Sequence, residues 1–191
     1  MSHAQHEPHA DHGSGNKKIA ILISVLAALL AIVETAGKNA QTQFLSHQVE
    51  ASNLWAFYQA KTIRRTEVSA AVDRLQLDRS LIPEVQIQVG MAIDKQLAAW
   101  RADVDRWESE PSTGEGRREL TARAQAQEKL RDDSSRRYHW FEYGSAALQL
   151  AIVLASASIV TGMVLLAWGA IGLGGLGGAL GLWAWLAPAL V

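Results

Sequence analysis

The sequence contains no cysteine. A disulfide framework, a thiolate metal site and a cysteine nucleophile are therefore excluded, while the redox state of the compartment stays open. Basic residues are not in excess either, because 18 Lys and Arg face 19 Asp and Glu, for a net charge of -1. Without a basic surplus the chain lacks the electrostatic footprint of a nucleic-acid-binding protein. We therefore expect no nucleic-acid partner.

Charge is absent from the last quarter of the chain. Residues 146–191 contain no Asp, Glu, Lys, Arg or His over 46 positions. A charge-free apolar stretch of that length exceeds one helix of a soluble core and is long enough for two membrane spans. We predict one span at 146–169 and a second, rich in glycine, at 171–191.

A third apolar segment lies near the amino terminus. Residues 19–37 approach the ~20 residues that a helix needs to cross a bilayer, and Lys17 and Lys18 precede them. A cleaved signal peptide is the competing interpretation, because the lysine pair resembles its basic region. Cleavage after Ala36 would put Glu34 three residues before the cut, which disfavours processing. We expect an uncleaved span and a multi-pass membrane protein in contact with lipid.

Small residues recur at helical spacing in the two carboxyl-terminal spans. Such spacing lets helix backbones approach closely in lipid. Two interpretations stay open: the two spans pack against each other as a hairpin, or the glycines form a contact between subunits. The residues that we expect to pack in this way are Ala151, Ala155, Gly174, Gly177, Gly178 and Gly181.

The region between the spans, residues 38–145, has few helix breakers. Proline occurs there only at positions 83 and 111. Long helices follow, and we predict an all-α fold in which 38–145 forms an extramembrane, coiled-coil-like hairpin with breaks near 80–90 and 111–115. The apex falls near 80–90, because both arms must return to the same membrane face. Ser112 and Glu115 have the spacing of a capping box that opens the next helix.

An apolar stripe follows the break at 80–90 with a helical period. A lone hairpin buries little surface, so we interpret this stripe as packing against further helices. The chain is therefore expected to form a homo-oligomer or to bind another membrane protein. The stripe residues assigned to this packing are Leu97, Trp100, Val104 and Trp107.

Two His/Glu pairs, His47 with Glu50 and His139 with Glu142, are candidates for a metal site. In each pair the residues are three apart and share a helix face. Both pairs lie just outside predicted spans on antiparallel arms, and helical bundles build di-metal sites from such groups. However, the order is the reverse of the usual Glu-x-x-His and further carboxylates are missing. Polar contacts between helices are therefore the alternative to a divalent transition metal.

Four histidines also occur in the first 12 residues, which are polar and lack an apolar stripe. His-rich tracts can chelate metals loosely. We predict instead that residues 1–18 form a disordered His-rich tail.

Signatures of catalysis are missing from the sequence. It has no nucleophile elbow, phosphate-binding loop or zinc-protease helix motif. Residues 172–177 match G-x-G-x-x-G, but no strand precedes them and the chain ends before the acidic residue of a dinucleotide site. We expect no enzymatic activity, no obligatory cofactor and no small-molecule substrate.

Three stretches resemble a known family. They are WAFYQAKTIR at 55–64, His139 with Phe141, and LQLAIVLAS at 148–156. The chain resembles the DUF4337 family of bacterial membrane proteins, over most of its length. This resemblance implies three spans, a helical middle region and a multi-pass place in the bacterial inner membrane, but no activity. The side of the membrane that the hairpin faces stays open, because Lys and Arg counts conflict.

The leading prediction is a non-enzymatic integral membrane protein that acts as an oligomeric scaffold or interaction module. The alternative is a metal-binding or ion-handling membrane protein that uses the two His/Glu pairs.

Overall fold

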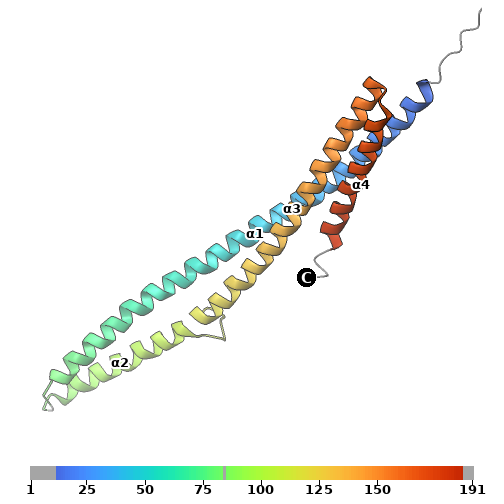
Figure 1. Cartoon of the computed structure of the whole chain (residues 1–191). Helices are drawn as coiled ribbons and strands as arrows, with labels where there is room; N and C mark the ends of the chain where they lie inside the picture. Colours follow the sequence, from blue (N-terminus) through green and yellow to red (C-terminus); the bar gives the residue numbers. More distant parts are fainter. Residues whose placement is uncertain (1–11, 84, 187–191) are drawn as a thin grey trace, which may run out of the picture. The chain divides into compact units, whose positions relative to one another are not determined.

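The computed structural model describes residues 12–83 and 85–186, and within them it contains four α-helices and no strand (Figure 1). The all-helical prediction is confirmed. In chain order the helices are α1 (His12–Leu81), α2 (Ile87–Glu108), α3 (Arg117–Thr161) and α4 (Val164–Leu186).

The chain divides into two compact units. Unit 1 comprises the chain up to Phe44 and from Asp132 onward, and unit 2 comprises Leu45–Arg131. Both α1 and α3 contribute a segment to each unit. Three helices, α1, α3 and α4, are long and apolar enough to cross a membrane.

Helix α1 runs for 70 residues because no proline interrupts it. It ends at Leu81, two residues before Pro83, where the pyrrolidine ring disfavours helical geometry in the preceding residue. The connection to α2 therefore falls inside the predicted break at 80–90. The second connection, residues 109–116, contains Pro111 and Gly114, and Gly114 has a φ of 69° that favours glycine.

Two predicted boundaries are wrong. Residues 12–18 are helical and belong to α1, so this part of the predicted tail 1–18 is not disordered; residues 1–11 lie outside the described residues. The predicted span 146–169 is also interrupted, because α3 ends at Thr161 and α4 already begins at Val164. Gly162 makes this turn with a φ of 69°. Hydropathy is equally high on both sides of Gly162, so it could not locate the turn.

Unit 1 is a bundle of three helices packed through small residues. Its buried core includes Leu148 and Ala151, neither of which is exposed to solvent. On α4, Gly174 lies against Leu26 and Gly181 against Val33, so α4 runs parallel to α1. Gly174 also lies near Ala151 and Gly181 near Gly144, so α4 runs antiparallel to α3.

Unit 2 pairs α1 with α2 and then with the first part of α3, in antiparallel order. Arg79 binds Asp94 beside the α1–α2 turn, and His47 binds Gln127 at the other end. A small apolar core formed by Leu54, Leu120 and Ala124 lies between these contacts. Unit 2 is therefore held by a thin core and by polar contacts between its helices.

Candidate functional site

A charged cluster joins all three helices of unit 2. The Glu108 carboxylate accepts a hydrogen bond from Arg117 Nη1 at 2.9 Å and forms ion pairs with Arg65 at 3.3 Å and Arg118 at 3.5 Å. Because charge-assisted bonds are the strongest hydrogen bonds in proteins, this single carboxylate fixes the ends of α2 and α3 on α1.

Arg117 extends the cluster to the aromatic part of α1. Its Nη2 donates to the hydroxyl of Tyr58 at 2.8 Å, and the guanidinium carbon lies 4.9 Å from the centre of the Tyr58 ring. Trp55 packs edge to face on Tyr58, and its indole N–H donates to Glu128 at 3.0 Å. The inward half of the segment WAFYQAKTIR is thus occupied by packing inside unit 2, while Phe57 and Ile63 are exposed.

The capping box predicted at Ser112 and Glu115 does not cap the third helix. Instead, Glu119 in the first turn of α3 ties this helix to the end of α2: it accepts hydrogen bonds from the Ser109 hydroxyl at 2.7 Å and from the Glu110 backbone N–H at 3.1 Å. The Ser109 hydroxyl lowers the pKa of the Glu119 carboxyl, since it stabilises the ionised form. The spacing of Ser112 and Glu115 predicted a contact between them, whereas the observed pair in this stretch is Ser109 with Glu119.

The two predicted His/Glu pairs lie in different units. His47 and Glu50 belong to unit 2, where His47 Nδ1 is 2.8 Å from Gln127 Oε1. His139 and Glu142 belong to unit 1 and contact each other at 3.5 Å. Over 12–83 and 85–186, no group of three or more His, Asp or Glu side chains is arranged to hold a metal ion. The metal site stays a prediction.

A polar pair in unit 1 escaped the sequence analysis. Gln149 Nε2 on α3 donates to Glu34 Oε1 on α1 at 3.0 Å. Both residues stand in otherwise apolar helix segments, where an unpaired polar group is costly. Their isolation among apolar residues was the signal that could have identified them as partners.

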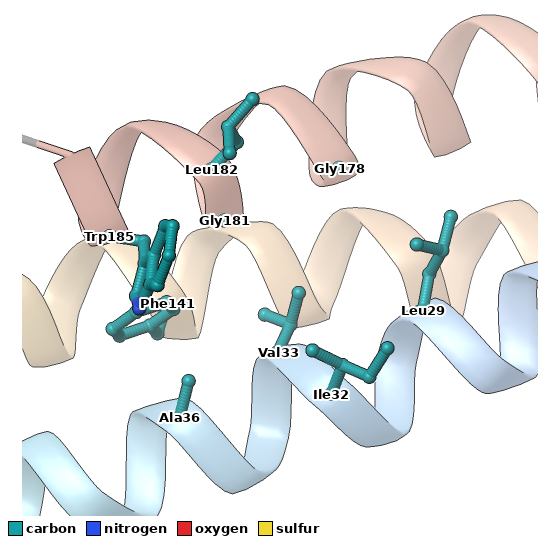
Figure 2. A pocket seen from close by; sticks show the side chains of 9 residues that line it. All are labelled: Leu29, Ile32, Val33, Ala36, Phe141, Gly178, Gly181, Leu182 and Trp185. Atoms are coloured by element: carbon teal, nitrogen blue, oxygen red, sulfur yellow. The ribbon is translucent and has the colours of Figure 1, made fainter.

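The small residues of the predicted spans differ in what they contact. Ala151, Ala155 and three of the four glycines are buried inside unit 1. Gly178 is different, because a Cβ placed on it would meet no atom within 4 Å. It borders an apolar pocket of about 370 Å³ with no titratable side chain in its lining. Figure 2 shows Phe141 and Trp185 at one end of this pocket and Leu29 toward the other.

The α2 stripe faces its own unit. Leu97 is buried, and Trp100, Val104 and Trp107 are partly buried within unit 2. An apolar period marks a face that is covered, but it does not say whether the cover comes from the same chain or from another copy.

Apolar side chains are exposed around the turn between α1 and α2, which the sequence analysis did not predict. We define the tip as residues 77–83 and 85–91. Six large apolar side chains are exposed there: Leu77, Leu81, Val85, Ile87, Val89 and Met91. Of these residues, Val85, Ile87 and Val89 alternate with polar residues in the sequence.

The model of the DUF4337 family, described as a domain of unknown function, matches residues 15–187. This match covers nearly the whole chain, and the chain belongs to that family. The family prediction is confirmed. No curated protein and no solved structure is similar to the chain.

Proposed function

We propose that this DUF4337 family member is a non-enzymatic integral protein of the bacterial inner membrane that works as a homo-oligomeric scaffold. Unit 1 anchors the chain in the bilayer, and unit 2 associates with further copies. The observation that carries this proposal is the outward exposure of apolar side chains on both units.

The membrane anchor is supported by the surface of unit 1. Large apolar side chains on all three of its helices are exposed, among them Ile21, Leu150, Val153, Leu165 and Trp183. Apolar surface left in water costs roughly 25 cal/mol per Å². Hydrocarbon removes that cost, and each helix already satisfies its own backbone hydrogen bonds, as a spanning segment must.

The scaffold role is supported by unit 2. Its apolar core is small, yet Val49, Phe57 and Ile63 on α1 and the tip residues remain exposed. Its charged side chains meanwhile pair with one another across helices, as around Glu108. This pairing supports a structural use of the polar groups, while the uncovered apolar groups are available for another copy.

Fractionation and mass determination test both parts of the proposal. Full-length protein is expected to stay in the membrane pellet after alkaline carbonate washing. In nanodiscs, light scattering is expected to give one defined oligomer above the 20.7 kDa of the monomer. Recovery in the aqueous fraction would contradict the anchor, and a monomer at every concentration would contradict the scaffold.

A further inference from the structure

The apolar pocket of unit 1 lies between α1 and α4, with Phe141 of α3 in its lining. All nine lining residues are apolar, glycine included, and the volume of about 370 Å³ falls within the ~300–1,000 Å³ of small-molecule sites. A Cβ on Gly178 would meet no atom within 4 Å, so glycine keeps the pocket open at this position. The pocket therefore has room for an apolar group from outside the chain.

The pocket extends from one end of the spanning bundle toward its middle. Helix α4 has 23 residues, or a length of about 34 Å, which matches the ~30 Å of bilayer hydrocarbon. Trp185, one residue before the end of α4, lies at one end of the pocket with Phe141, and Leu29 lies toward the other (Figure 2). Tryptophan is enriched where a span meets the headgroups, so this end marks the membrane surface.

The length of the pocket fits one acyl chain better than a second helix. From Ala36 to Leu29 it follows α1 for seven residues, or roughly 10 Å, which is about two thirds of one leaflet. A helix is itself ~10–12 Å wide with its side chains and packs along several turns of its neighbour. A hydrocarbon chain is narrower and enters from the leaflet in the direction of the pocket.

A cation lies beyond the surface end of the pocket. Arg137 precedes Phe141 by four residues on α3, and it therefore continues the helix face on which Phe141 lines the pocket and Gly144 contacts α4. The rise between these two residues is ~6 Å. Since the headgroup layer is roughly 5–8 Å thick, Arg137 lies at the level of the lipid phosphates.

Arg137 has a hydrogen-bond donor that the described part of the chain does not use. Its Nε is buried and has no hydrogen-bond partner within residues 12–83 and 85–186. Asp133, one turn before it, pairs with Arg136 instead. The other two arginines with an unpaired Nε both contact the Glu108 carboxylate. A phosphate suits Arg137, because its oxygens match the donor geometry of a guanidinium.

We propose that this pocket and Arg137 form a binding site for one anionic phospholipid of the bilayer, with an acyl chain along α1 and α4 and the phosphate at the guanidinium. This inference rests on the membrane anchor in the proposed function and adds a specific ligand to it. Hydrocarbon already surrounds an acyl chain in the bilayer, so the chain gains only packing in the pocket. The headgroup contact therefore sets the selectivity, and a net negative headgroup is favoured.

Removal of the charge tests the headgroup contact. Full-length protein is released from nanodiscs of phosphatidylglycerol or of phosphatidylcholine, and native mass spectrometry counts the lipids retained per chain. We expect one phosphatidylglycerol per chain in the parent protein and roughly tenfold weaker retention in Arg137→Gln, because a hydrogen bond to a charged group is worth about that factor. Arg137→Lys keeps part of the retention. The matched control is Arg136→Gln, next to it on α3, which retains lipid like the parent.

A larger side chain at position 178 tests the acyl-chain contact. Gly178→Leu fills the pocket and is expected to abolish retention of phosphatidylglycerol. Gly172→Leu is the matched control, because Gly172 also has no atom within 4 Å of an added Cβ but does not line the pocket. Circular dichroism in phosphatidylcholine nanodiscs shows whether the variants keep their helix content.

The lipid site and the membrane anchor fail in distinguishable ways. If the protein stays in the membrane pellet but retains no phosphatidylglycerol, or loses it equally in Arg137→Gln and Arg136→Gln, the lipid site is wrong and the anchor stands. If Gly178→Leu lowers the mass of the oligomer while phosphatidylglycerol is still retained, a second copy occupies the pocket and the lipid site is overturned. Recovery of the protein in the aqueous fraction contradicts both.

Discussion

Unit 1 and unit 2 hold their helices together by different chemistry. In unit 1 the helices meet where glycine and alanine bring backbones close, as at Gly177 against Gly144. In unit 2 they meet at hydrogen bonds and ion pairs, with Glu108 at the centre of three arginines. Close packing stabilises helices in hydrocarbon, where burying apolar groups brings no gain. Polar pairs between helices suit a segment bathed in water, so the contrast fits two different solvents.

The largest expected effect distinguishes two neighbouring glycines in unit 1. A Cβ on Gly177 would lie 2.7 Å from the Gly144 carbonyl oxygen, whereas one on Gly178 would meet nothing within 4 Å. Gly177→Ala is expected to destabilise the bundle by about 2–3 kcal/mol, because backbone must move. Gly178→Ala is expected to be neutral or slightly stabilising, since alanine favours helix. Thermal unfolding in nanodiscs measures both, and equal effects would contradict the packing of unit 1.

A smaller effect is expected for the charged cluster of unit 2. Glu108→Gln keeps the shape of the side chain but leaves three arginines without their carboxylate. Since these groups are partly exposed, the cost is about 1–2 kcal/mol and falls as salt is raised. Asp103→Asn is the control, because it removes an exposed pair with Arg106 within one helix. If salt leaves the effect of Glu108→Gln unchanged, the claim that charged contacts hold the helices of unit 2 together is contradicted.

The contact between Glu119 and Ser109 predicts a modest dependence on pH in unit 2. Because the folded pKa of Glu119 lies below its ordinary value, this contact stabilises the fold at neutral pH. This contribution is lost as the pH falls through that lowered pKa. Ser109→Ala is therefore expected to lower the melting temperature more at pH 7 than at pH 3, where protonation of Glu119 is further advanced. A difference that is the same at both values would assign another role to Ser109.

The smallest effect is expected from the histidines. If the scaffold proposal holds, the double variant His47→Ala/His139→Ala keeps the oligomer, because the two residues belong to different units. Light scattering checks the oligomer, and elemental analysis of protein purified without added metal checks the metal content. Near-stoichiometric Zn, Fe, Mn or Cu that disappears in the double variant would favour the metal-binding alternative.

The sequence was informative where one property changes sharply along the chain. Loss of charge after Ser145 and the scarcity of proline predicted the all-helical fold and the three long apolar helices. The turn at Gly162 was missed because apolar residues continue on both sides of it. The residues that contact Gly174 and Gly181 could not be predicted either. Small residues indicate that another helix packs closely, but they do not identify that helix.

The candidate surfaces were harder to predict than the helices. The period of the α2 stripe is the same whether Leu97 faces its own unit or another copy. The exposed apolar residues around the α1–α2 turn were not identified because the exposure of a side chain depends on the helices packed beside it. Whether an apolar side chain is exposed can be determined only once the positions of the neighbouring helices are known.

The continuity of α1 has a consequence for how such chains can vary. Each residue added to a helix turns everything beyond it by about 100°. A single insertion in α1 between His47 and Arg79 would rotate one of these side chains away from its partner, Gln127 on α3 or Asp94 on α2. Changes in length within this stretch are therefore expected in steps of about seven residues, with a matching change in the helices that pack on it.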